Sequence, residues 1–110
     1  MNILPRYDTV IIPLDKLIRY ALDPVKDPNK ATAFKLALNY DKNNADKLIS
    51  NIKANLNKFP AKNKGDRGYG TLYEVVMELT GENGKTANVL TAWIDDKTNG
   101  EMRLVTVHID

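Results

Sequence analysis

Three strand-like runs follow one another in the last third of the chain, and they constrain the fold more than any other feature. Residues 71–80 alternate apolar and polar side chains, the period of two expected of a half-buried strand. Residues 86–94 and 102–109 are rich in β-branched and other apolar residues. Short segments containing Gly, Asn and Asp separate the runs, at 81–84 and 95–100. The pattern predicts an antiparallel meander, because consecutive strands joined by short turns usually pair.

Helical periodicity precedes this meander in three segments, residues 14–22, 28–39 and 45–58. Asp27-Pro28 supplies an N-cap followed by proline at the first helical position, and Phe59-Pro60 ends the third segment. We therefore predict one α+β domain over residues 1–110, with three N-terminal helices packed on one face of a C-terminal antiparallel meander. The apolar run 9–12 is a candidate for an added N-terminal edge strand, and Pro13 ends it.

The composition excludes several kinds of site. The chain has no cysteine and one histidine, so disulfides, thiolate metal sites, cysteine nucleophiles and multi-histidine metal sites are excluded. We expect no metal and no cofactor. No apolar stretch approaches the roughly 20 residues that a membrane span requires, so no membrane span is expected. The opening residues lack a signal-peptide pattern, and the chain is compatible with being part of a longer protein.

A basic segment follows the third helix. The net charge is only +2, but the cations Lys53, Lys58, Lys62, Lys64 and Arg67 face a single acidic residue, Asp66, in that window. We interpret residues 58–68 as a glycine-containing, flexible loop. Such a loop could contact phosphates, and it could equally be a solvated surface loop.

Short motifs are spread over nearly the whole chain: Ile12-Pro13, Lys16-Leu17 with Tyr20, Lys30 with Phe34, Gly68-Tyr69-Gly70 before Tyr73-Glu74-Val75, Thr91 to Ile94, and Arg103 to Thr106. Together they resemble a bacterial domain family found at the C-terminal ends of polymorphic and contact-dependent growth-inhibition toxins. The order of helices before a curved meander is also similar to the ribonuclease superfamily of barnase, EndoU, the anticodon-nuclease colicins and RelE-type toxins, a fold-level analogy.

The resemblance implies a toxin domain that cuts RNA, tRNA among the candidates, without a metal. It further implies a cognate immunity protein as partner, action in the bacterial cytoplasm, and an origin as the C-terminal part of a larger secreted or cell-surface toxin.

Metal-independent RNA cleavage needs proton transfer at the 2′-hydroxyl and the leaving oxygen, and donors or cations for the charge on phosphorus. His108 is the only histidine, the residue type whose unperturbed pKa lies near neutrality, and Arg103 can bind phosphate through two nitrogens. Further candidates for catalysis could supply a positive charge or a hydroxyl group: Lys16, Lys35, Thr91, Thr106 and Tyr73. Candidates for RNA binding could contact phosphates or stack on a base: Lys62, Lys64, Arg67, Tyr69 and Trp93.

Strand register decides which of these residues share a face. Pairing Thr91 with Thr106 places Trp93 opposite Leu104 and groups His108 with both threonines. A shift by one residue groups Arg103 with Trp93 and moves His108 to the other face. Arg103 and Thr106 can share a face only if the strand contains a bulge.

Each candidate also has a purely structural interpretation. Trp93 and Tyr73 suit the core, Lys16 and Lys35 a helix surface, and the lone histidine a strand surface. Asp95, Asp96 and Glu101 suggest a metal only weakly, because a polar turn explains them. The alternative function is a non-catalytic protein-interaction module, such as an immunity or accessory protein.

Overall fold

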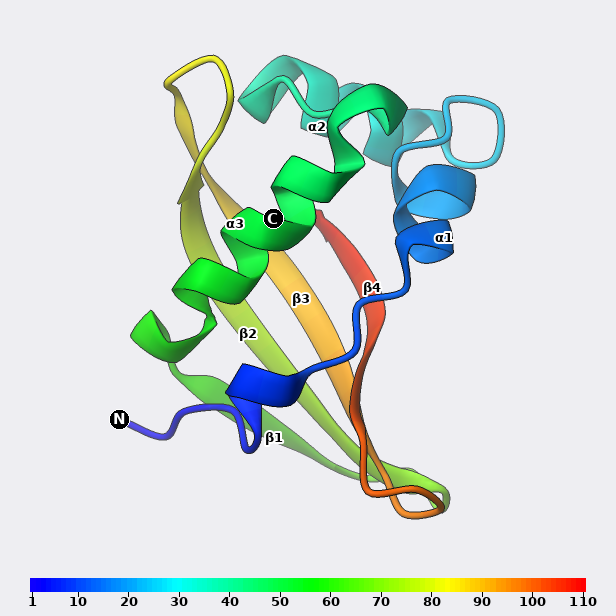
Figure 1. Ribbon diagram of the computed structural model, residues 1–110, viewed down its shortest axis with the longest axis vertical. Coiled ribbons are helices and arrows are strands. Elements are labelled where there is room, and N and C mark those ends of the chain that lie inside the picture. The colour runs from blue at the N-terminus through cyan, green and yellow to red at the C-terminus, as the bar shows by residue number, and fades with distance from the viewer.

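The computed structural model describes residues 1–110 and confirms the α+β class, with helices before strands (Figure 1). The helices are α1 (Leu14–Lys16), which runs on into a π-helical turn (Leu17–Ala21), α2 (Pro28–Leu38) and α3 (Ala45–Asn55). Short 3₁₀ segments occur at Tyr7–Thr9, Lys42–Asn44 and Leu56–Lys58. The strands are β1 (Ala61–Asp66), β2 (Gly70–Thr80), β3 (Thr86–Asp96) and β4 (Met102–Ile109).

The four strands form one antiparallel sheet in the order β1-β2-β3-β4. The β2–β3 hairpin keeps one register from the pair Gly70 and Asp96 to the pair Thr80 and Thr86. The predicted meander is confirmed for β2, β3 and β4.

The segment 58–68, expected to be a flexible loop, contains strand β1, so that expectation is wrong. Lys62 pairs with Glu74, and Asn63 pairs with Tyr73. All of β1 after Ala61 is exposed, so it lacks the apolar alternation by which a half-buried strand is recognised. An irregularity between Asn63 and Asp66, where Gly65 has a φ of 99°, bends this edge strand.

The N-terminal segment, residues 1–13, contacts both edges of the sheet. Near its start the carbonyl of Asn2 accepts a hydrogen bond from the N–H of Ala61 on β1, at 2.7 Å. Near its end Ile11 forms a parallel bridge with Arg103 on β4. The edge strand expected at 9–12 is thus reduced to this single bridge.

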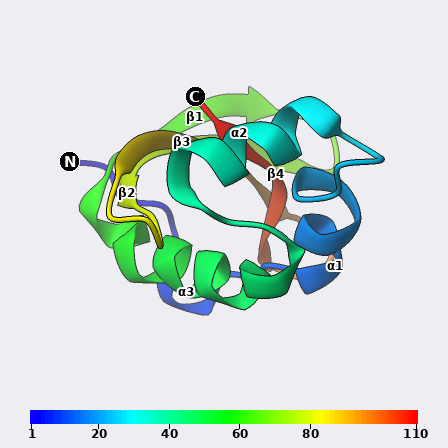
Figure 2. The same cartoon turned by 90° about the horizontal axis from the view of Figure 1, so that it is seen from above.

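One core cluster of 20 buried residues lies between the helices and one face of the sheet. Trp93 on β3 and Met77 on β2 come from the sheet, while Phe34 on α2 and Ile52 on α3 come from the helices, and all four are fully buried. Seen from above, the sheet curves around the helices (Figure 2). The opposite face carries no helix and is called here the helix-free face.

No helix in the structure combines the length and the apolar character needed to cross a membrane.

Candidate functional site

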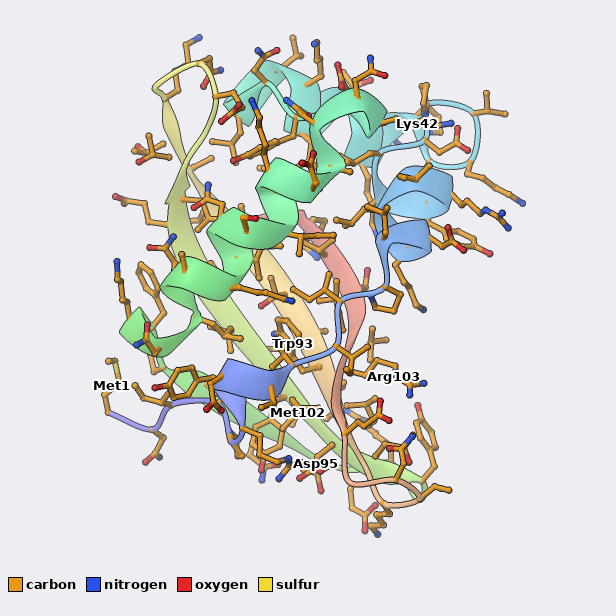
Figure 3. The ribbon with its side chains drawn as sticks, viewed as in Figure 1. Met1, Lys42, Trp93, Asp95, Met102 and Arg103 are labelled. Atoms are coloured by element: carbon orange, nitrogen blue, oxygen red, sulfur yellow. The ribbon has the colours of Figure 1, made fainter.

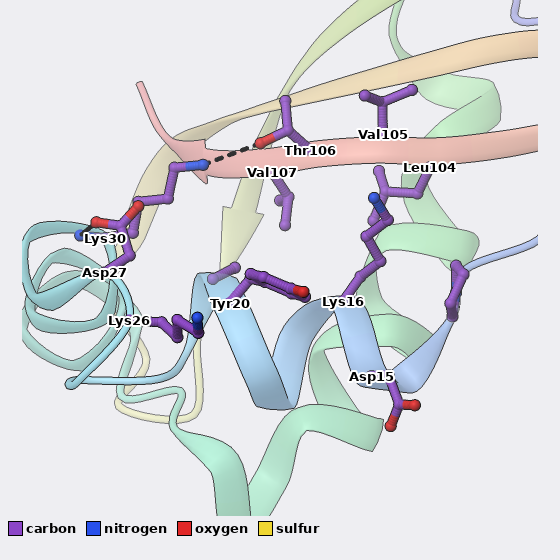
Figure 4. A pocket seen from close by; sticks show the side chains of 12 residues that line it. Asp15, Lys16, Tyr20, Lys26, Asp27, Lys30, Leu104, Val105, Thr106 and Val107 are labelled. Atoms are coloured by element: carbon purple, nitrogen blue, oxygen red, sulfur yellow. Dashed lines mark hydrogen bonds between the residues drawn. The ribbon is translucent and has the colours of Figure 1, made fainter.

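A cavity of about 540 Å³ opens beside the edge of β4. Its walls come from α1 with the π-helical turn, from the start of α2 with the loop before it, and from β4 residues Leu104 to Val107 (Figure 4). The polar side chains that the cavity brings together include Lys16, Tyr20, Lys26, Lys30 and Thr106. Residues from opposite ends of the chain therefore meet in one place.

Local sequence signals place these side chains. The Asp27 carboxylate accepts a hydrogen bond from the backbone N–H of Lys30 at 3.1 Å, and Pro28 occupies the first turn. This cap fixes the turn from which Lys30 projects. On the other wall, the N–H of Leu22 donates to the carbonyl of Leu17, the bonding pattern of a π-helical turn.

The cavity is locally positive. Lys16, Lys26 and Lys30 form no ion pair, since none has a carboxylate within 4.0 Å of its ammonium. Two aspartates also belong to the lining, so its three lysines leave a net charge of +1; Asp15 pairs with Arg19 at 3.9 Å, and Asp27 Oδ1 accepts the hydrogen bond of the helix cap. Three unpaired ammonium groups around one cavity attract an anion.

Lys30 joins the cavity to the sheet. Its Nζ donates a hydrogen bond to Thr106 Oγ1 at 2.9 Å (Figure 4). This contact links the first turn of α2 to the edge strand, and it places an ammonium group beside a hydroxyl.

A bulge in β4 determines which residues share the helix-free face. Trp93 pairs with Leu104 but Ala92 pairs with Thr106, so Val105 is the extra residue. At Trp93, which pairs with Leu104, the observed register agrees with the first of the two expected registers. From Ala92 toward the start of β3 the pairing is shifted by one residue, so that Thr106 pairs with Ala92 and not with Thr91.

The alternation of side chains along β3 determines which β4 residues lie on the helix-free face. Trp93 and Thr91 face the helices, so the residues between and beside them on β3 face the other way. The β4 partners of those residues are Arg103, Thr106 and His108. All three therefore lie on the helix-free face. The bulge is what allows Arg103 and Thr106 to share this face, as the sequence analysis anticipated.

His108 is oriented by its neighbour. Its Nδ1 lies 3.0 Å from the carbonyl oxygen of Ile109. Because a carbonyl oxygen only accepts, a hydrogen bond here assigns the proton to Nδ1 and leaves Nε2 of the neutral ring as a free acceptor. The ring can then take a proton at Nε2.

The guanidinium group of Arg103 uses only some of its hydrogen-bond donors. One of its terminal nitrogens, Nη2, donates to Glu101 at 3.0 Å, while its buried Nε has no hydrogen-bond partner. In Figure 3 Arg103 extends outward from β4.

Two residues predicted to be in the site belong to the core. The Thr91 hydroxyl donates to the carbonyl of Val75 and accepts from Nε1 of Trp93, both at 2.8 Å, and both side chains are fully buried. The catalytic role expected of Thr91 and the base-stacking role expected of Trp93 are wrong, because neither side chain reaches solvent.

The other candidates lie apart from the cavity at β4. Tyr73 packs against the core on the helix side and lines a different cavity near Asn2. Lys35 forms an ion pair with Asp41 at 2.9 Å and lines a third cavity. The remaining predicted RNA contacts are exposed on or next to β1: Lys62, Lys64, Arg67 and Tyr69.

The cavity also contains residues that the sequence did not single out for chemistry, namely Tyr20, Lys26 and Lys30. A signal was present for two of them, because Tyr20 and Lys30 belong to the motifs that carry the family resemblance. Lys26 gave none, since a lysine in a short connecting loop is common on any surface.

No three His, Asp or Glu side chains gather as a set of metal ligands. The carboxylates near the β3–β4 turn are engaged elsewhere, Asp95 with Arg6 and Glu101 with Arg103.

No curated protein and no solved structure matches the chain. A family profile matches residues 3–110, a range that includes every cavity residue named above. The chain therefore belongs to the family described as "Domain of unknown function (DUF6883)".

Proposed function

We propose that this chain is a metal-independent endoribonuclease domain whose site lies where the β4 cavity meets the helix-free face. One observation carries the proposal: the hydrogen bond from Lys30 to Thr106 joins a group of unpaired cations to the strand that bears Arg103 and His108. Cations, a hydroxyl and an imidazole along one strand edge are the groups that phosphodiester cleavage needs.

In the proposed reaction, the scissile phosphate contacts the ammonium of Lys30 and the hydroxyl of Thr106. Nε2 of His108 takes the proton of the 2′-hydroxyl, and the 2′-oxygen bonds to phosphorus as the bond to the 5′-oxygen breaks. A lysine ammonium of the cavity protonates the leaving oxygen. The products are a 2′,3′-cyclic phosphate and a 5′-hydroxyl end.

Arg103 has a supporting role. Its guanidinium holds a neighbouring phosphate or the charge that develops on phosphorus. Thr106 and His108 are two positions apart on one face, about 7 Å between Cα atoms, which is within the span of one nucleotide.

The biological part of the proposal follows the family resemblance. The domain is a bacterial toxin that acts on cytoplasmic RNA, tRNA among the candidates, after delivery as part of a larger secreted or cell-surface protein. A cognate immunity protein neutralises it.

The decisive experiment is incubation of the purified chain with total bacterial RNA in the presence of EDTA, followed by sequencing of RNA ends. We expect new 5′-hydroxyl ends at defined positions. His108→Ala and Lys30→Ala should abolish them, whereas Lys53→Ala should not, because Lys53 is an exposed lysine on α3 away from the cavity. Intact tRNA and rRNA after incubation with the wild type would overturn the proposal.

Expression inside bacteria tests the toxin role separately. The wild type should arrest growth, and Arg103→Ala or His108→Ala should relieve the arrest.

One observation favours the alternative, a protein-interaction module. Val76 on β2 and Val105 on β4 are 39% and 38% exposed, so the strands present apolar side chains to solvent. Harmless expression together with intact RNA would support this function instead.

A further inference from the structure

Tyr20 presents an aromatic ring in the positively charged cavity. Tyr20 lines the cavity although the residue is 56% exposed, so it is both accessible and part of the wall. In Figure 4 the ring is drawn between Lys26 on one side and Lys16 on the other. An exposed ring is a platform on which a flat group can stack.

The rest of the lining complements this ring. Ala21, Leu104 and Val107 supply apolar wall, and all three are nearly or fully buried. Lys16, Lys26 and Lys30 supply positive charge. The volume of about 540 Å³ lies within the range of about 300–1,000 Å³ typical of small-molecule sites.

We infer that the cavity binds one nucleoside monophosphate unit of an RNA strand, with its base stacked on Tyr20 and its phosphate on the lysine ammonium groups. This inference deepens the proposed ribonuclease function and rests on it. It makes Tyr20 a binding residue for the nucleotide beside the cut, in place of the base platform expected at Trp93.

The lining also limits base selectivity. It contains no Asn or Gln side chain, the groups that commonly read a base edge through two hydrogen bonds. The carboxylate of Asp27 is held in place by the helix-cap hydrogen bond to its Oδ1. Stacking alone accepts any base, so we expect similar affinities for purine and pyrimidine nucleotides.

The test is binding of four probes to the purified chain: 3′-adenosine monophosphate, 3′-uridine monophosphate, inorganic phosphate and adenosine. Calorimetry or NMR titration should show that both mononucleotides bind more tightly than phosphate or adenosine alone. Tyr20→Ala should weaken mononucleotide binding about tenfold without changing phosphate binding, because only stacking is lost. Tyr20→Phe should keep the wild-type affinity.

Two further variants complete the design. Lys26→Ala should weaken the binding of mononucleotides and inorganic phosphate together. Tyr7→Ala is the matched control, since Tyr7 is also partly exposed, at 38%, but lies outside the cavity, so its loss should change nothing. Far-UV circular dichroism and the thermal midpoint establish that each variant is folded.

Equal affinity for mononucleotide and inorganic phosphate in the wild type would overturn the inference, and so would an unchanged affinity in Tyr20→Ala. Failure of the ribonuclease proposal looks different. If the chain binds nucleotides through Tyr20 but leaves RNA intact, the nucleotide site is supported and the proposed cleavage activity is ruled out. If Tyr20→Ala cleaves RNA with an unchanged KM, the nucleotide site at Tyr20 is ruled out while the ribonuclease proposal stands.

Discussion

The Nζ of Lys30 donates to Oγ1 of Thr106 at 2.9 Å, a contact between residues 76 positions apart in the chain. It is the one side-chain hydrogen bond by which the cavity cations reach the sheet. If the site works as proposed, this contact orients both the ammonium and the hydroxyl for phosphate.

Replacing Thr106 by Val removes the acceptor while keeping the side-chain shape. We expect RNA cleavage to fall roughly tenfold or more, because a group that stabilises charge on phosphorus is lost. The free energy of unfolding should fall by about 1 kcal/mol or less, the usual contribution of one partly exposed hydrogen bond. Thr106→Ser retains the hydroxyl and should restore cleavage. A fully active Thr106→Val protein would show that the hydroxyl takes no part.

Deleting Val105 removes the bulge in β4. The residues on either side then alternate as in a regular strand, because Leu104 and Thr106 already pair with the adjacent residues Trp93 and Ala92. The buried side chains of β4 stay in the core, so the free energy of unfolding in urea should change by about 1 kcal/mol or less. The matched contrast is deletion of Ala92 from the facing strand, which brings the buried side chains of Thr91 and Trp93 next to each other and turns one of them out of the core. That deletion should lower the free energy of unfolding by about 2 kcal/mol or more, and an equal loss in the Val105 deletion would contradict the observed register.

Thr91→Val tests the core role of a residue first considered for catalysis. The variant leaves Nε1–H of Trp93 without its partner in a fully buried position. We expect a loss of about 1–3 kcal/mol in the free energy of unfolding, measured by urea titration with tryptophan fluorescence. Thr86→Val is the control, because Thr86 lies on the same strand but is exposed. Folded Thr91→Val protein should keep its RNA affinity, so a specific loss of binding would return Thr91 to the site.

The free energy of unfolding should depend on pH through the carboxylate of Asp41. Its carboxylate accepts hydrogen bonds from Nζ of Lys35 and the N–H of Asn43, and these hold the pKa of Asp41 below its ordinary value of 3.8. A pKa that is lower in the folded state means that the unfolded chain binds the proton first as the pH falls. The stabilisation by Asp41 is therefore present above the unfolded pKa and is lost as the pH falls through the folded pKa.

Asp41→Asn should accordingly be less stable than the wild type at neutral pH, with the difference shrinking on acidification. Urea unfolding over a series from about pH 6 to pH 3 measures this. Asp8→Asn, an exposed aspartate without an ion pair, should follow the wild-type curve. A constant gap between Asp41→Asn and the wild type at every pH would mean that the ionised carboxylate is not the cause.

The sequence predicted the elements that contribute apolar side chains to the core. Strand β2 shows this as an alternation, β3 and β4 as runs of β-branched and other apolar residues, and the helical segments as a helical period. Strand β1 gives no such signal, because all of its residues after Ala61 are exposed. It forms through backbone pairing with β2, which leaves no trace in the side-chain pattern.

The candidate site was predictable only in part for a similar reason. Lys16 and Thr106 were expected together and do line one cavity. The bulge at Val105 depends on how β4 pairs with β3, and no residue type at that position marks it. Thr91 and Trp93 look reactive in a sequence, but their hydrogen bond to each other in the core satisfies both.

The first eleven residues meet β1 through Asn2 and β4 through Ile11, the two outermost strands of the sheet. Unpaired outer strands are where separate molecules join into aggregates. A shortened chain that starts after Ile11 would leave the N–H groups of Ala61 and Leu104 and the carbonyl of Met102 without these partners. We therefore expect such a chain to aggregate more readily than the whole domain, because one segment satisfies backbone groups at both edges of the sheet.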